Sequence, residues 1–282
     1  IAQELECNFN MSGETVFHPE DMEIIEQGLC EPKYKTGFDR NLWIWEEYNP
    51  GADYMISADV ARGDGKDYST FHIFNIQNSE IVAEYQGKPT PDVFAEILYQ
   101  TGKEYGECML VVENNSVGWD VLTRLEDLGY GSLYYSKKSS HEHVEAYLSE
   151  SAGVIPGFTT SSKTRPLTIS KLEELIRNKL ITIKSKRLFN EMKTFVWENG
   201  RPQAMKKHND DLIMACAIGC WVKETVYSSN QRSVEYKKAF LGAMRSTNSE
   251  LNTSIPGMVA YKEKQKKQNE KNYKDFVWLI KG

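Results

Sequence analysis

Apolar positions follow two spacings along the chain, and each spacing predicts a different kind of element. Between residues 54 and 86, short apolar runs rich in β-branched and aromatic residues alternate with turn residues. This pattern predicts strands at 54–60, 69–77 and 80–86. Because the connections between them are short, we expect these three strands to form an antiparallel meander.

Helical spacing becomes frequent after residue 90. It predicts helices at 91–105, 117–128, 167–179, 187–195 and 211–224, strands at 108–113 and 133–135, and a hairpin at 195–204 with an Asn-Gly turn. Strands joined by helical crossovers run parallel to each other. The order therefore predicts an α/β fold: a mixed sheet of three antiparallel strands followed by parallel strands, flanked by helices. A basic, polar loop at 136–165 would be an insertion in this fold.

The ends of the chain differ from its middle. We expect residues 1–50 to be an irregular lead-in with a short helix at 22–27, and residues 51–227 to form the main domain. Residues 228–282 are rich in Ser, Asn and Lys, which favours a flexible C-terminal tail. The chain opens at Ile1 without an initiator Met, so we expect it to be a piece of a longer protein.

The charge of the chain is uneven. The formal net charge of -6 would not suggest a nucleic-acid partner, but residues 131–210 carry 14 Lys and Arg against 8 Asp and Glu. This basic stretch suits a groove that attracts phosphates, although charged faces of solvated helices would give the same count. The cations that we assign to DNA backbone phosphates are Lys137, Lys138, Lys163, Arg165, Lys184, Lys186, Arg187, Arg201, Lys206 and Lys207.

The cysteines and the apolar runs narrow the class of protein further. The five cysteines are scattered, so a disulfide framework is not expected, and Cys216 and Cys220 are better explained by buried packing than by metal binding. We find no signal peptide and no apolar run long enough for a membrane span, so we expect a cytosolic protein. No phosphate-binding loop of the Walker type is present, which excludes a nucleotide motor within these residues.

Three acidic sites arrive on three separate predicted elements. Asp59 ends the first apolar strand, Glu113 ends another, and Asp210 and Asp211 open the apolar helix. Several carboxylates at one place suit a two-metal phosphodiester hydrolase, with Mg²⁺ as the expected cofactor and Mn²⁺ as a possible substitute. Each residue also has a simpler explanation: a turn cap for Asp59, a surface strand end for Glu113, and a helix cap for one of the aspartates.

The helical pattern separates the two aspartates. Asp211 shares a stripe with Met214 and Ile218 and should face the core, whereas Asp210 is the natural N-cap. We therefore predict Asp211 as the metal ligand and Asp210 as the alternative ligand. Auxiliary roles are predicted for Asp67 and for Asn114, which could contact the scissile strand, and for His208, which could orient water or contact the scissile phosphate.

The three blocks together resemble a known family. Residues 55–69, 112–115 and 209–214 are similar to the C-terminal nuclease domain of the large terminase (DNA-packaging) subunit of T-even-type tailed bacteriophages. Residues 3–7 and 12–13 resemble the lead-in that joins the packaging ATPase to that nuclease. The resemblance implies a ribonuclease H-like fold and an endonuclease that cuts concatemeric viral DNA at the start and end of packaging. It further implies a catalytic triad of Asp59, Glu113 and Asp211.

The resemblance also implies partners and a location. These are double-stranded DNA, the packaging ATPase domain of the same full-length protein, the portal and the small terminase subunit, in the cytoplasm of the infected bacterial host. Two alternatives remain open from the residues alone. One is a Holliday-junction resolvase or transposase-like nuclease of the same fold, and the other is a non-catalytic DNA-binding or portal-docking module.

The hairpin invites one expectation about motion. Its tip carries Arg201, able to meet a phosphate, and it directly precedes the segment with Asp211. We expect it to act as a mobile flap at the mouth of the active site. An ordinary surface hairpin is the simpler alternative.

Overall fold

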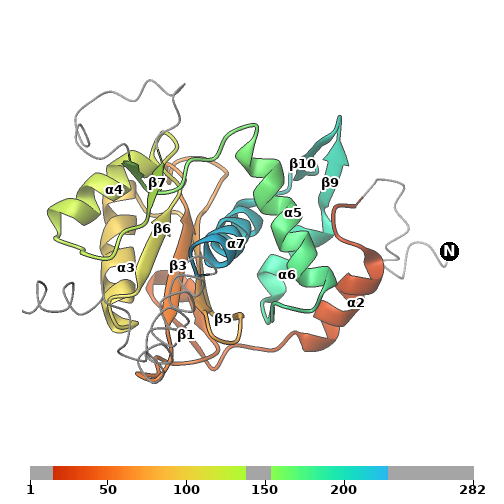
Figure 1. Ribbon diagram of the computed structural model, residues 1–282, viewed down its shortest axis with the longest axis horizontal. Coiled ribbons are helices and arrows are strands. Elements are labelled where there is room, and N and C mark those ends of the chain that lie inside the picture. The colour runs from red at the N-terminus through yellow and green to blue at the C-terminus, as the bar shows by residue number, and fades with distance from the viewer. Residues whose placement is uncertain (1–14, 138–153, 228–282) are drawn as a thin grey trace, which may run out of the picture. The chain divides into compact units, whose positions relative to one another are not determined.

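The computed structural model describes residues 15–137 and 154–227 (Figure 1). The chain divides into two units, Ile1–Tyr227 and Ser228–Gly282, and every described residue belongs to the first. The predicted tail, Lys138 and the first part of the lead-in lie outside the described residues. Within the described part, no helix is long and apolar enough to cross a membrane.

A six-stranded mixed sheet forms the centre of the described unit. Its strands are β1 (Tyr34–Thr36), β2 (Leu42–Ile44), β3 (Tyr54–Asp59), β4 (Ser69–Asn75), β5 (Glu80–Gly87) and β6 (Met109–Val112). Their order across the sheet is β1-β2-β5-β4-β3-β6. The predicted meander of β3, β4 and β5 is confirmed as antiparallel, and β6 runs parallel to β3.

The central strands are covered by side chains on both faces. Every residue of β3 is buried except its last, Asp59, and every residue of β4 is buried. A strand covered on both faces needs apolar or small residues at nearly every position, so it reads as a continuous apolar run. This is why the sequence predicted β3 so clearly, and why its final carboxylate is conspicuous.

The two margins of the sheet correct the sequence-based expectation. Strand β2 pairs antiparallel with β5, and β1 pairs with β2, so part of the lead-in that we expected to be irregular belongs to the sheet. Helix α2 (Pro19–Gly28) is longer than the predicted short helix in the same segment. The assignment of residues 1–50 as a linker stays a prediction.

Beyond β6, the predicted strand at 133–135 is reduced to a single parallel bridge between Leu133 and Leu110. The chain then forms β7 (Tyr135–Lys137), which pairs antiparallel with β8 (Val154–Pro156). Strand β8 falls inside the stretch that we expected to be a polar loop. The described part of this stretch therefore contributes to a small two-stranded sheet.

Helices cover both faces of the main sheet (Figure 1). They are α3 (Pro91–Glu104), α4 (Gly118–Asp127), α5 (Thr164–Arg177), α6 (Lys186–Lys193) and α7 (Asp211–Val222), with a short 3₁₀ turn at Phe38–Arg40 and a π turn at Lys223–Tyr227. Phe94 and Leu125 of α3 and α4 pack in the core on one face. Leu172 and Leu188 of α5 and α6 share the core of the other face with α7.

Helix α7 lies directly on the sheet. From Leu212 to Cys220 every residue is buried, which explains why the helix is apolar on all sides. Gly219 allows the close approach, because a Cβ added there would lie 2.4 Å from the Phe74 ring and 3.0 Å from Cβ of Ser57. The first residue of α7, Asp211, is thereby brought to the sheet.

The predicted hairpin is confirmed as β9 (Phe195–Glu198) and β10 (Arg201–Ala204). Asn199 and Gly200 both have positive φ, 52° and 73°, as a type I′ turn requires. The base of the hairpin is anchored: Phe195 is fully buried and its carbonyl accepts from the Val16 N–H at 3.1 Å. Within the hairpin, only the tip is exposed. The predicted mobile flap would therefore consist of the tip alone, and its motion stays a prediction.

Candidate active site

Two of the predicted carboxylates end neighbouring parallel strands. Asp59 is the last residue of β3, and Glu113 follows the last residue of β6. Ala58 and Val112 are partners in the register, and the Glu113 N–H donates to the Ala58 carbonyl at 2.9 Å. The charge of Glu113 accordingly contributes to the raised pKa of Asp59. The sheet register therefore sets their proximity.

Glu113 is fixed by its surroundings. Asn115 Nδ2 donates to Glu113 Oε1 at 2.9 Å. The start of α4 presses against the backbone at this point, since a Cβ on Gly118 would lie 1.8 Å from the Glu113 carbonyl oxygen. Only glycine fits at this approach, so α4 can begin immediately behind the carboxylate.

Asp211, the first residue of α7, lies near the same end of the sheet. Its Oδ2 accepts from the Tyr68 N–H at 2.9 Å and from Asn209 Nδ2 at 3.1 Å. Its backbone carbonyl accepts from the Thr70 hydroxyl at 2.9 Å. Thr70 is the register partner of Asp59 across β3 and β4. The three carboxylates predicted from the sequence are thus brought to one end of the sheet.

The electrostatics of this cluster are unfavourable for three negative charges. Burial and the charges of Glu113, Asp211 and Asp210 raise the pKa of Asp59 well above its usual value. Burial raises the pKa of Asp211 to about 6, against the opposing hydrogen bonds from Tyr68 and Asn209. Carboxylates whose ionisation is opposed by each other are the groups that a divalent cation stabilises.

The donor set fits Mg²⁺ or Mn²⁺ in its chemistry, because both ions prefer oxygen ligands. Within residues 15–137 and 154–227, however, no three His, Cys, Asp or Glu side chains stand arranged as a ready-made metal site. Asp59, Glu113 and Asp211 lie at one end of the sheet and are the candidate ligands of such an ion.

Asp210 differs from the expectation. It occupies the N-cap position of α7, but its side chain makes no capping hydrogen bond. Its carboxylate instead forms an ion pair with Arg165 of α5. Asp210 is therefore the N-cap residue of α7, as predicted, but the helix start receives no hydrogen bond from its side chain.

The auxiliary residues have different surroundings. Asn114 is 3% exposed and donates from Nδ2 to the Pro156 carbonyl at 2.9 Å, so it ties β8 to the end of β6. Its contact with a scissile strand stays a prediction. Asp67 is exposed, and its charge contributes to the raised pKa of Asp211. His208 is exposed at the turn before α7.

Two of the predicted DNA-binding cations are engaged in the fold itself. Lys184 forms ion pairs with Glu46 and Glu80. Arg187 donates from Nε to Glu84 Oε1 at 2.7 Å, and its guanidinium group stacks on the ring of Trp43. Both residues therefore have partners within the fold, and their assignment to DNA stays a prediction. Lys163, Lys186, Arg201, Lys206 and Lys207 are exposed, and Lys137 lies on β7.

Arg165 and Arg201 line one pocket of about 410 Å³ between the start of α5 and the hairpin. The other lining residues are Thr160, Ser161, Ser162, Pro166, Pro202 and Gln203. Through its ion pair with Asp210, Arg165 joins this pocket to the residue beside Asp211. The pocket thus offers hydroxyl and guanidinium donors next to the carboxylate cluster.

Sequence reasoning missed one polar residue near this site, Glu191 of α6. It accepts hydrogen bonds from the backbone of α7, and its pKa is raised to about 9 by burial and by the charge of Asp211. A signal was present in the sequence. Glu191 lies three positions after Leu188 and next to Met192, on the buried stripe of α6, where a charged residue is unexpected.

The six-stranded mixed sheet with helices on both faces is a ribonuclease H-like α/β fold. Three solved structures with this fold are nucleases of phage large terminases. Those of thermophilic phage G20c with bound cobalt and with bound magnesium are 20% and 18% identical, and both align with a TM-score of 0.55 over 74% of this chain and 97% of theirs. The large terminase nuclease domain of Thermus phage P74-26 is 19% identical, with a TM-score of 0.52 over 72% of this chain and 95% of its own. No protein-family model matches the chain.

Proposed function

We propose that this chain is the nuclease part of a large terminase subunit of the T-even type, and that it cuts concatemeric double-stranded DNA with little sequence specificity. The observation that carries the proposal is the position of Asp59 and Glu113 at the ends of two paired parallel strands. Asp211 lies at the same end of the sheet, because its carbonyl is bonded to Thr70, the register partner of Asp59. Structural neighbours described as terminase nucleases, one of them with bound magnesium, support it.

Asp59, Glu113 and Asp211 would hold the divalent cation, with Asp210 as a further ligand once Arg165 releases it. A bound Mg²⁺ or Mn²⁺ supplies a deprotonated water at neutral pH and stabilises the charge that develops on the phosphate. A bound cation would favour ionised Asp59, whose pKa is raised by burial and by its three acidic neighbours. The Tyr68 N–H and Asn209 hold the Asp211 side chain in one orientation, so this side chain is already ordered before an ion binds.

The pocket that holds Arg165 and Arg201 is where we expect DNA phosphates near the cleavage site to bind. Guanidinium groups and hydroxyls contact the DNA backbone rather than base edges, which gives binding with little sequence dependence. Lys206 and Lys207 are exposed in the segment before α7 and would extend this contact.

The remaining parts of the proposal concern partners and place. The packaging ATPase domain would belong to the same full-length protein, and the portal and the small terminase subunit would be the other partners. The work would take place in the cytoplasm of the infected bacterial host. These assignments follow from the resemblance of the sequence blocks and agree with the class of the structural neighbours.

A plasmid-nicking assay tests the proposal. The wild-type chain should nick supercoiled DNA with Mg²⁺ or Mn²⁺ and not with EDTA. Asp59→Asn, Glu113→Gln and Asp211→Asn should each lower the rate by at least about 100-fold, because each removes a cation ligand. Asp127→Asn and Glu104→Gln are matched controls on exposed acidic residues and should keep the wild-type rate. Wild-type rates in all three site variants would refute the active-site assignment.

A substrate panel distinguishes this proposal from a nuclease of the same fold with a different role. Linear, supercoiled and four-way junction DNA should be cut at comparable rates per site. A strong preference for the four-way junction would instead favour a resolvase. Metal-dependent nicking of any of them would exclude a purely non-catalytic docking module.

A further inference from the structure

The first turn of α7, which carries Asp211, has no cap from its own segment. The side chain at the N-cap position, Asp210, is engaged by Arg165. The first N–H groups of a helix have no partner within the helix. Leu212 and Ile213 are fully buried, so unpaired donors at this point would be costly.

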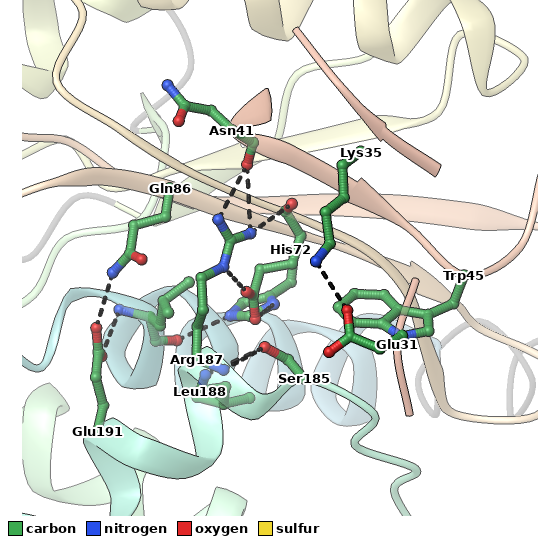
Figure 2. A network of polar contacts seen from close by, with 12 residues as sticks. Glu31, Lys35, Asn41, Trp45, His72, Gln86, Ser185, Arg187, Leu188 and Glu191 are labelled. Atoms are coloured by element: carbon green, nitrogen blue, oxygen red, sulfur yellow. Dashed lines mark hydrogen bonds and ion pairs between the residues drawn. The ribbon is translucent and has the colours of Figure 1, made fainter. Parts of the chain in front are cut away.

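Glu191 supplies the missing acceptor from a different helix (Figure 2). Its Oε2 accepts from the Leu212 N–H at 2.9 Å and from the Ile213 N–H at 3.3 Å. Its other oxygen, Oε1, accepts from Gln86 Nε2 of β5 at 3.2 Å. One residue of α6 thus joins the start of α7 to a strand of the sheet.

Two side chains of β4 hold the carbonyl groups of the same turn. The Thr70 hydroxyl donates to the Asp211 carbonyl at 2.9 Å, and His72 Nε2 lies 2.9 Å from the Leu212 carbonyl. A carbonyl oxygen only accepts hydrogen bonds, so this contact places a proton on His72 Nε2, which donates to it. The first turn of α7 is therefore fixed through both its donors and its acceptors.

We propose that Glu191 is a positioning residue for Asp211: its two bonds to the backbone fix the first turn of α7, so that the Asp211 carboxylate meets Asp59 and Glu113 at a cation. The inference rests on the proposed function for the identity of that site. Asp211 is the first residue of the helix, directly before the two residues whose N–H groups Glu191 holds. Loss of those bonds would let the turn fray and would move Asp211 away from the Tyr68 N–H.

The test uses the full 282-residue chain and three variants. Glu191→Ala removes the acceptor, and Glu191→Gln keeps an acceptor oxygen of the same reach. Met192→Ala is the matched control, because Met192 is the next residue of α6, is 1% exposed, and packs in the same core. Glu191→Met, which keeps the length but not the acceptor, replaces the alanine variant should that one fail to fold.

Mn²⁺ affinity without DNA, measured by calorimetry, is the first readout. Glu191→Ala should weaken it about 10- to 100-fold, as removal of a residue that orients a ligand does, and Glu191→Gln should restore it to within about threefold. Met192→Ala should lower the Tm without changing the Mn²⁺ affinity. In hydrogen exchange, the Leu212 and Ile213 amides should lose protection in Glu191→Ala alone.

The cleavage kinetics give a second readout. Glu191→Ala should lower kcat and leave KM for DNA unchanged. A Glu191→Ala protein with wild-type Mn²⁺ affinity and only a lowered Tm would show a structural cap and would overturn the inference. Wild-type protein that binds Mn²⁺ but does not nick DNA would count against the proposed function alone, and wild-type protein that binds no Mn²⁺ would overturn both.

Discussion

Replacement of the proposed metal ligand Asp211 by asparagine should stabilise the metal-free protein. Both hydrogen bonds to the Asp211 side chain end on one atom, Oδ2, which accepts from Tyr68 and from Asn209. An amide oxygen can accept the same two bonds. The substitution therefore keeps the local contacts and removes a charge that burial disfavours.

The magnitude follows from the pKa. Burial raises the pKa of Asp211 from 3.8 to about 6, and ionisation of the group in the folded state then costs about 3 kcal/mol. Because the pKa is raised on folding, this cost is absent below about pH 4, grows between about pH 4 and pH 6, and is complete above pH 6. Asp211→Asn should thus raise the free energy of unfolding by about 1–3 kcal/mol at pH 7.5 and leave it almost unchanged at pH 4. This range allows for the weaker hydrogen bonds that a neutral acceptor makes.

Thermal unfolding in EDTA, measured at several pH values, checks this prediction. For a unit of this size, 1 kcal/mol corresponds to about 2–4 °C in Tm. The Tm of Asp211→Asn should exceed that of the wild type at pH 7.5, and the difference should vanish toward pH 4. Added Mn²⁺ should raise the Tm of the wild type and not that of the variant. A lower Tm for Asp211→Asn at pH 7.5, or a difference independent of pH, would refute the reasoning.

Three further predictions concern Asp210, Arg187 and Arg201. Asp210→Asn should lower nicking by less than about tenfold and change stability by less than about 1 kcal/mol, because it removes one partly exposed ion pair and no fixed ligand; loss of activity equal to that of Asp211→Asn would reverse the ligand assignment. Arg187→Met should cost about 3–5 kcal/mol in denaturant unfolding, because it leaves the buried Glu84 carboxylate uncompensated, whereas Lys186→Met should change stability by less than about 0.5 kcal/mol. Arg201→Gln should weaken DNA binding equally for all sequences and lower its salt dependence by about one phosphate contact, and an unchanged salt slope would remove Arg201 from the interface.

Elements with a strong local pattern could be predicted from the sequence. Strand β3 is buried on both faces and reads as an apolar run, so its terminal Asp59 was visible as an exception. Glu113 was visible for the same reason at the end of β6. Strands β1 and β2 have three residues each, and β1 is exposed throughout, so neither produces a periodic signal.

Contacts between distant segments could not be predicted in this way. Arg187 meets Glu84 across 103 positions of sequence, and Glu191 meets Leu212 across 21. A basic residue in a basic stretch looks like a phosphate ligand until its partner is known. For this reason Lys184 and Arg187 were assigned to DNA, although both stabilise the fold.

The three carboxylates are held in two different ways: Asp59 and Glu113 by paired strands, and Asp211 by the start of a helix. Asp59 and Glu113 belong to neighbouring parallel strands, so their separation is a property of the backbone, about 4.8 Å between strands, and cannot drift without loss of the sheet. Asp211 stands on a helix whose start is held by side chains. Substitutions around α7 would therefore change the affinity for the proposed cation over a continuous range, without refolding the protein. A change that disrupts the pairing of β3 and β6 would instead abolish the arrangement of Asp59 and Glu113 altogether.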